Sequence, residues 1–435
     1  MVRSAVLGVA VVCLAGLTGV AARAGTPDEG VLYSFKGAPK DGLSPRAPLI
    51  QGSDGAFYGT TLLGGTGKCA SLSCGAVFQL NPPVPGKAVW TETLLYSFAG
   101  GKDGQVPYAG LIADSAGAFY GTTDLGGGGL CKPAGGGCGT VYRLVPPASG
   151  TVWTETVLYS FKGGKDGEHP YAGLLLGTGG VLYGTTSGGG TANQGTVFKL
   201  TPPPKGKTVW TETILLRFNG TDGTDPEAGL LAGKSGVLYG TAAHGGTVKR
   251  GTAFSLTPPA PGKTAWTELT LYSFPGGTSG AYPVAPLVAD SSGALYGTTM
   301  SGGDCSSLCG TVFKLAPPPT GKTTWTATVI HRFLGFDDGA EPVGGLLARA
   351  GSVLYGTTSA GGGLACSLGN CGTVFKLTPN AKHTVWTETV LHQFTGAGDG
   401  LSPSASLIAD ELGELYGTTA TGGARDEGTV FTVVP

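Results

Sequence analysis

The residues of this chain that could do chemistry are few. Nine cysteines and five histidines occur in 435 residues. Eight of the cysteines form four closely spaced pairs: Cys69 with Cys74, Cys131 with Cys138, Cys305 with Cys309, and Cys366 with Cys371. Paired thiols at such short spacing either ligate a metal ion or form local disulfides.

The surroundings of these pairs favour disulfides over metal ligation. None of the four segments contains a histidine, and two thiolates alone do not complete a tetrahedral metal site. An even number of cysteines confined to one kind of loop is typical of an exported chain. We therefore predict four local disulfides and no metal site. Each closes a short loop, so each stabilises the fold by only about 2 kcal/mol.

The five histidines form no catalytic motif. His331 and His392 replace a tyrosine found at the same place in other copies of a repeated segment, which predicts that they are packing variants. His383 lies in a turn, and His169 and His244 come from different repeats with no motif around either. We predict no catalytic residue and no cofactor. Two carboxylates from different repeats would leave no linear trace, so a glycosidase is the enzymatic alternative.

Two other recurring residue types could bind a ligand. Asp-Gly pairs recur at Asp41, Asp103, Asp166, Asp222, Asp338 and Asp399. Calcium needs about six or more oxygen ligands, and each of these segments offers one or two carboxylates, so we interpret the pairs as tight turns. Tryptophan recurs at Trp90, Trp153, Trp210, Trp266, Trp325 and Trp386. Such rings could stack on sugars, but one repeated strand position is more typical of packing between repeats.

A repeat defines the elements that would position these residues. A Leu-Tyr-Gly-Thr-Thr-like segment occurs seven times, with its tyrosine at Tyr58, Tyr120, Tyr183, Tyr239, Tyr296, Tyr355 and Tyr416. In the second unit, four short segments (109–113, 118–123, 139–144 and 153–161) are separated by glycine-, proline- and aspartate-rich turns. Their threonine, valine and aromatic residues predict β-strands, and no sustained helical periodicity occurs. A fixed period of this kind is typical of propellers and solenoids.

The two ends of the repeat array decide between a ring and an open solenoid. Residues 31–35 read as a fourth strand with no unit before them, and residues 428–433 read as a third strand with none after them. Pairing these strands closes the ring and removes an exposed sheet edge. We therefore predict an all-β fold: a single seven-bladed β-propeller with four antiparallel strands per blade, spanning residues 25–435.

The N-terminus and the composition indicate the compartment. Residues 1–24 resemble a secretory signal, with Arg3, an apolar run over 5–20 and an Ala-Arg-Ala site at 22–24. Cleavage there would remove Cys13. The net charge is -1 and only 13% of residues are charged, so nucleic-acid binding is not expected. No later segment is apolar enough to span a membrane.

The repeat resembles the GloVer-type tandem repeat of exported bacterial proteins. The matching segments in the third unit are Leu-Tyr-Gly-Thr-Thr at 182–186, three glycines at 188–190 and Gly-Thr-Val-Phe-Lys-Leu at 195–200. The fourth unit departs from this pattern at Ala242 and Ala253. The resemblance covers about residues 31–434. It implies an extracytoplasmic repeat protein and no established activity.

The expected position of a binding site follows from propeller geometry. The glycine- and cysteine-rich loops and the links between blades share one face, and their variety favours that face for binding. We expect a secreted or surface scaffold, monomeric and non-enzymatic, whose candidate ligands are extracellular glycans or proteins; no binding residue is predicted. The alternatives are a carbohydrate-active hydrolase or lyase with its site in the central funnel, and a purely structural envelope component.

Overall fold

The structure is a computed structural model. It describes residues 29–435 except 70–72, 85, 130, 132–135, 305–307, 364–365, 367–370 and 397. The predicted signal segment 1–24 lies outside the described residues, so its cleavage stays a prediction.

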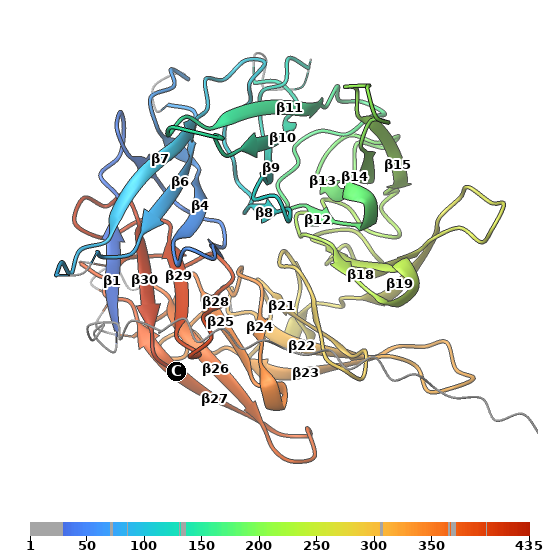
Figure 1. The fold of residues 1–435 in the computed structure, drawn as a ribbon. Coiled ribbons are helices and arrows are strands. Elements are labelled where there is room, and N and C mark those ends of the chain that lie inside the picture. The colour runs from blue at the N-terminus through green and yellow to red at the C-terminus, as the bar shows by residue number, and fades with distance from the viewer. Residues whose placement is uncertain are drawn as a thin grey trace, which may run out of the picture.

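The described residues form seven four-stranded antiparallel sheets around a central axis, which confirms the predicted seven-bladed propeller (Figure 1). Within each blade the strands run outward in chain order. The strands of blades 1 to 4 are β3 (Ile50–Gln51), β4 (Phe57–Thr61), β6 (Ala76–Asn81), β7 (Thr91–Ser97); β8 (Ile112–Ala113), β9 (Phe119–Thr123), β10 (Thr140–Val145), β11 (Thr154–Ser160); β12 (Leu175–Leu176), β13 (Leu182–Thr186), β14 (Thr196–Thr201), β15 (Thr211–Arg217); and β16 (Leu231–Ala232), β17 (Leu238–Ala242), β18 (Thr252–Thr257), β19 (Thr267–Ser273).

Blades 5 to 7 repeat this order, except that the outermost strand of blade 7 comes from the N-terminal end. Their strands are β20 (Val288–Ala289), β21 (Leu295–Thr299), β22 (Thr311–Ala316), β23 (Thr326–Arg332); β24 (Leu347–Ala348), β25 (Leu354–Thr358), β26 (Thr373–Pro379), β27 (Trp386–Gln393); and β28 (Ile408–Ala409), β29 (Leu415–Thr419), β30 (Thr429–Val433), β1 (Glu29–Ser34). A small extra sheet pairs β2 (Gly42–Leu43) with β5 (Leu63–Gly64).

Helical structure is limited, among the described residues, to four short 3₁₀ turns: η1 (Thr178–Gly180), η2 (Lys234–Gly236), η3 (Gly277–Ser279) and η4 (Ala350–Ser352). In this part of the chain, no helix has the length and hydropathy of a membrane span.

The tyrosine and glycine of the repeated motif act within their own blade. In blade 5, the Tyr296 hydroxyl donates a hydrogen bond to Asp290 in the turn between the first two strands, at 2.9 Å. Gly297 lies opposite Phe313 on the third strand, and a Cβ at this glycine would lie 2.7 Å from the phenyl ring. The motif therefore anchors a turn and leaves room for the aromatic ring beside it.

The two threonines of the motif bond to different neighbours. The second threonine pairs with a threonine on the third strand, as Thr299 does with Thr311 at 2.8 Å. The first crosses to the next blade, as Thr60 Oγ1 does by donating to the Ala109 carbonyl at 2.9 Å. Equivalent crossing bonds start from Thr122, Thr185, Thr241, Thr298, Thr357 and Thr418. One motif thus ties each blade to the following one.

Aromatic rings fill the space between blades. Phe161, just after the outer strand of blade 2, meets Phe198 of blade 3 edge-to-face at 5.1 Å. The tryptophans also pack: Trp386 of blade 6 meets a tyrosine of blade 5, as the sequence interpretation predicts, while Trp153 stacks on Phe119 of its own blade at 5.2 Å. Where the packing is between blades, a single blade would leave the rings exposed.

Blade 7 is closed by both ends of the described chain. Strand β1 pairs antiparallel with β30, with Val31 opposite Phe431. The interface from blade 7 to blade 1 uses the same contacts as the others: Thr418 donates to the Ala47 carbonyl at 3.2 Å, and Phe35 meets a phenylalanine of blade 1 at 5.1 Å. The predicted ring closure is therefore confirmed.

Candidate functional site

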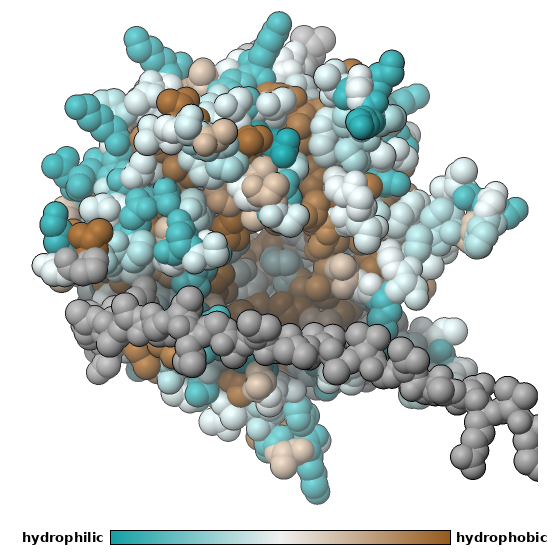
Figure 2. Space-filling view, viewed as in Figure 1, coloured by the Kyte–Doolittle hydropathy of each residue, from teal (hydrophilic) through white to brown (hydrophobic). Residues whose placement is uncertain are grey.

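A cavity of about 540 Å³ lies on the axis of the ring. Seven of the residues that line it occupy one equivalent position in the seven links between blades: Arg46, Tyr108, Tyr171, Glu227, Val284, Val343 and Ser404. Figure 2 shows the molecule hollowed at its centre. Met300 and Ser359, which begin second-to-third-strand loops, also line the cavity, so it lies on the face that carries the cysteine loops.

Backbone hydrogen bonds hold each link between two neighbouring loops. The amide of His169 donates to the Cys138 carbonyl in the loop of blade 2, and the His169 carbonyl accepts from Ser187 in the loop of blade 3. Glu341 makes the same two bonds, to Cys309 and Ser359. Because the link is fixed on both sides, the side chain two residues later is held at the cavity wall.

The residue at the centre of each such contact has a left-handed backbone. These seven residues, which we name the linker ring, have φ between 52° and 61°: Ser44, Val106, His169, Asp225, Tyr282, Glu341 and Ser402. None is glycine, although glycine avoids the cost of about 1 kcal/mol that other residues pay in this region. Two of them, Glu341 and Ser402, also line the cavity.

One side of the cavity wall is aromatic. The rings of Tyr108 and Tyr171 meet edge-to-face at 5.2 Å. Behind them, His169 Nδ1 lies 2.8 Å from Asp124 Oδ1, and the imidazole is stacked beside Tyr171 at 6.3 Å. Burial first, and then the negative charges of Asp124 and Glu227, raise the pKa of Tyr171 to about 12. Tyr171 is therefore a neutral hydrogen-bonding group at physiological pH.

The neighbouring wall is acidic. The Glu227 side chain is exposed at the cavity, yet the surrounding protein desolvates its carboxyl and raises its pKa, and the nearby charge of Asp225 raises it further. Asp225 Oδ2 lies 3.2 Å from His244 Nδ1, and this hydrogen bond raises the pKa of His244. Burial also raises the pKa of Glu341. The cavity therefore combines flat tyrosine rings with carboxyls and one guanidinium, that of Arg46.

The rim next to the acidic wall carries a cation and an aromatic ring. The Arg250 guanidinium donates to the Tyr282 hydroxyl and lies over its ring, 5.4 Å from the centroid. The His244 ring meets the same tyrosine at 5.0 Å. His169 and His244 thus both lie beside the cavity, each paired with an aspartate from a neighbouring blade or link, and the structure does not bring the two histidines together as a catalytic pair.

The cysteine loops follow the sequence prediction where they are described. Disulfides join Cys69 to Cys74, Cys131 to Cys138 and Cys366 to Cys371, with Cα–Cα distances of 5.1, 5.1 and 5.7 Å. The fourth predicted pair includes Cys305, which lies outside the described residues.

The Asp-Gly segments are turns whose aspartates bond to protein. Asp41 accepts hydrogen bonds from the Tyr33 hydroxyl at 2.6 Å and from the Lys36 amide at 3.0 Å. Asp103 accepts from the Tyr96 hydroxyl, also at 2.6 Å. The Asp-Gly segments therefore form turns, as the sequence predicts. The sequence does not predict that a tyrosine on the preceding outer strand donates a hydrogen bond to the aspartate.

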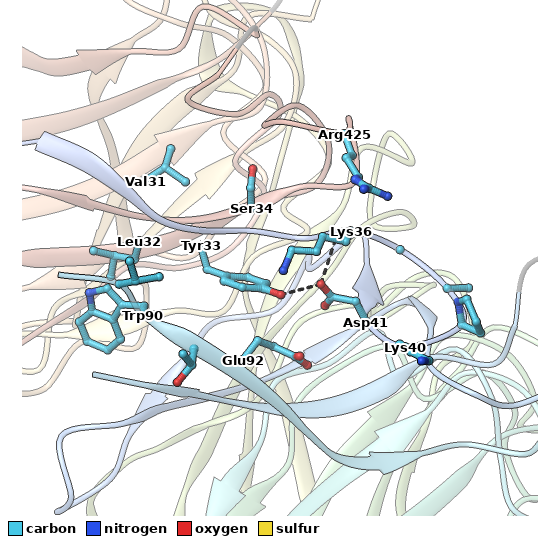
Figure 3. Close-up of a pocket in the computed structure, with 15 residues that line it drawn as sticks. Val31, Leu32, Tyr33, Ser34, Lys36, Lys40, Asp41, Trp90, Glu92 and Arg425 are labelled. Carbon is cyan, nitrogen blue, oxygen red and sulfur yellow. Dashed lines mark hydrogen bonds between the residues drawn. The ribbon is translucent and has the colours of Figure 1, made fainter. Parts of the chain in front are cut away.

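A larger groove of about 860 Å³ lies on the outside of the ring between β1 and β7 (Figure 3). Tyr33, Asp41 and Glu92 face one another there, and burial with the charge of Asp41 raises the pKa of Glu92 to about 8. The same tyrosine–aspartate–glutamate arrangement recurs at the next interface, where the pKa of Glu155 is also raised to about 8. We consider the groove part of the blade architecture because its polar residues repeat.

The sequence matches the model of the Gloeobacter/Verrucomicrobia repeat over residues 129–368 and 309–435. The chain belongs to this repeat family. No curated protein matches it.

Solved structures that resemble this chain share its fold at low identity. The extracellular domain of a candidate one-component system from B. thetaiotaomicron matches with 11% identity and a TM-score of 0.50, covering 93% of this chain and 42% of that one. A candidate 6-phosphogluconolactonase from Bacteroides uniformis matches with 13% identity and a TM-score of 0.47, covering 80% and 84%. A protein of unknown function from Dyadobacter fermentans matches with 13% identity and a TM-score of 0.43, covering 93% and 96%. At this identity the likeness concerns the fold alone.

Proposed function

We propose that this member of the repeat family is an extracytoplasmic binding scaffold whose central cavity takes a small glycan. The observation that carries the proposal is the linker ring: seven left-handed positions, none of them glycine, in a chain with 81 glycines. Strained backbone at a cavity mouth is a basis for a functional hypothesis. Elsewhere the blades repeat their residues, whereas the seven positions of the linker ring carry six different residue types.

The chemistry of the cavity wall favours a sugar. Tyr108 and Tyr171 present flat apolar rings with polar edges, and sugars present apolar C–H faces edged by hydroxyls. Glu227 and Arg46 supply a hydrogen-bond acceptor and donors for vicinal hydroxyls. The volume of about 540 Å³ lies within the range of ligand pockets and suits one or two sugar units.

The proposed location rests on the disulfides and on the signal-like segment 1–24. Local disulfides persist in oxidising compartments and are rare in the cytosol. The scaffold would therefore meet glycans at the cell surface or in the periplasm.

Titration calorimetry of the secreted chain against a panel of mono- and disaccharides tests the proposal. Replacing Tyr108 and Tyr171 together by alanine should weaken binding at least about tenfold, or 1.4 kcal/mol. The control is Val152→Ala, because Val152 is 80% exposed in a third-to-fourth-strand turn. Equal affinity of the tyrosine variant and the control would contradict the proposal, and a chain that binds no sugar would favour a structural role.

The raised pKa of Glu227 favours one enzymatic alternative, a glycoside hydrolase in the same cavity. A carboxyl whose pKa is raised by desolvation is suited to the general-acid role that such enzymes need. Release of reducing ends from a polysaccharide panel by the wild-type chain, lost in Glu227→Gln, would replace the binding proposal by the enzymatic one. Binding without turnover supports the scaffold.

A further inference from the structure

A second cluster of polar groups lies far from the axis, between the outer strands of blades 5 and 6. His331 comes from β23, Asp338 from the link that follows it, and Glu388 from β27. One potential ligand atom from each residue lies within 4.8 Å of the other two. His331 Nε2 is 3.9 Å from Asp338 Oδ2, which is too long for a hydrogen bond.

Two atoms of this cluster are buried without a hydrogen-bond partner, His331 Nε2 and Glu388 Oε1. Burying an unpaired polar atom costs about 1–3 kcal/mol, so two at one point need an explanation. Asp338 is oriented by the Leu334 amide, which donates to its carboxylate at 3.0 Å. All three side chains therefore point toward one small region. Neither His331 Nε2 nor Glu388 Oε1 has a hydrogen-bond partner there.

The other blade interfaces provide an internal comparison. Four of them have tyrosine in place of His331, and in three of these the hydroxyl donates to the aspartate of the link at 2.6 to 2.8 Å, as Tyr96 does to Asp103. The glutamate oxygen is unpaired at those interfaces also, as in Glu155. At the next interface the equivalent histidine, His392, has its Nε2 only 3.3 Å from Asp399. The His331 interface is thus distinguished by an imidazole nitrogen that lies 3.9 Å from its aspartate and has no hydrogen-bond partner.

The ring of His331 has a packing role as well. It meets Phe333 edge-to-face at 4.6 Å, as the sequence interpretation of a packing variant predicts. Packing places the ring, and it leaves Nε2 directed toward the two carboxyls. An imidazole nitrogen that has no hydrogen-bond partner can offer its lone pair to a metal ion.

We propose that His331, Asp338 and Glu388 bind a first-row divalent metal ion of the Zn²⁺ class. One nitrogen and two carboxylate oxygens are ligands that zinc accepts, with water completing the coordination. Ligand atoms of a tetrahedral zinc site lie about 3.3 Å apart, so the three side chains need to close by about 1 Å. The cluster has access to solvent, since 16% of the His331 side chain and 19% of the Asp338 side chain are exposed. The ion would join blade 5 to blade 6.

The test is the zinc content of the secreted chain, purified without a histidine tag, freed of metal by a chelator and titrated with Zn²⁺. We expect one ion per wild-type chain and a rise in the unfolding temperature when Zn²⁺ is added. His331→Tyr should weaken zinc binding at least about tenfold. Because tyrosine occupies this position in other blades, this variant should keep its fold and its unfolding temperature without metal. Glu388→Gln should weaken zinc binding similarly.

A variant that creates a second site tests the proposal without relying on a loss of zinc binding. Tyr96→His places the same three residue types at the interface of blades 1 and 2, with Asp103 and Glu155, and should raise the content to two ions per chain. The proposal is overturned if wild-type and His331→Tyr bind Zn²⁺ equally, or if the wild-type chain binds none. Ca²⁺ at the same concentration should not displace Zn²⁺, because the site has too few oxygens for calcium.

Discussion

The glycine of the repeated motif leaves room for an aromatic ring on the adjacent strand. A Cβ on Gly297 would lie 2.7 Å from the ring of Phe313 and 2.9 Å from Leu287. The Phe313 ring cannot move away freely, because it is held edge-to-face against Phe274 of the previous blade at 5.0 Å. A side chain here would therefore disturb packing both within and between blades.

Gly297→Ala should lower the free energy of unfolding by about 1–3 kcal/mol, the usual range for overpacking a core. Chemical denaturation measures this difference. Gly398→Ala is the control, because nothing lies within 4 Å of a Cβ built there. Equal stability of the two variants would show that the ring of Phe313 moves aside to accommodate the added methyl group at little cost in free energy.

At the scale of single residues, the sequence predicted the roles that depend on local spacing. The cysteines of the three described disulfides are separated by five or seven positions, so their pairing is visible in the chain itself. The cavity residues are not visible in this way, because Glu227 and Tyr171 come from different links and meet only in the ring. An alignment of the seven units at the linker ring shows that the residue type varies at the cavity-lining position two residues later.

At the scale of elements, neighbouring outer strands bring carboxyls together. Glu92 on β7 faces Asp41 in the preceding link, and Glu155 on β11 lies near Asp103 in the same way. Burial and the aspartate charge raise the pKa of each glutamate from 4.5 to about 8, although Lys36 offsets part of the effect at Glu92. The folded chain therefore holds these protons more tightly than the unfolded chain.

This difference predicts a stability that falls with rising pH. The contribution is fully present below about pH 4.5 and is lost as pH rises through 8, because the folded state must then give up protons that it binds tightly. The unfolding temperature should drop by a few degrees between pH 5 and pH 9. In the Glu92→Gln and Glu155→Gln double variant the drop should shrink, whereas Glu411→Gln at the exposed surface should leave it unchanged. A flat profile for the wild-type chain would contradict the prediction.

At the scale of the whole molecule, blade 7 is held to blade 1 as the other blades are held to one another. The crossing bond of Thr418 to the Ala47 carbonyl measures 3.2 Å, the same as the bond from Thr185 to Ala228. Both threonines are 1% exposed. The contact between blades 7 and 1 therefore has the same crossing hydrogen bond as the contact between blades 3 and 4. This holds even though strand β1 is far from the rest of blade 7 in sequence.

Thr418→Val and Thr185→Val should therefore lower the unfolding free energy by similar amounts, about 1 kcal/mol each, since each loses one buried hydrogen bond. Denaturation in urea compares them. Loss of stability in Thr185→Val but none in Thr418→Val would indicate that the ring is open at blade 7.

The ring could be predicted from the sequence because the motif recurs in every blade, and its glycine and first threonine make the same contacts in all seven. The spare strand at one end and the missing strand at the other indicated closure before any contact was known, and the register of β1 on β30 agrees. The contacts between blades were less visible, since the bond from Thr60 to Ala109 joins residues 49 positions apart. Spacing within a unit does not encode such a partner.

The pairing of β1 with β30 also determines how the molecule would carry a mechanical load. Glu29 lies opposite Val433, and Ser34 lies opposite Thr429, so the two outer ends of the described chain leave the pair at the same side. Tension between them would break the hydrogen bonds of the strand pair one after another, starting at the Glu29 end. It would not load all of these bonds at once in shear. A molecule pulled from both ends would therefore open at blade 7 first, and one tethered by a single end would carry no such load.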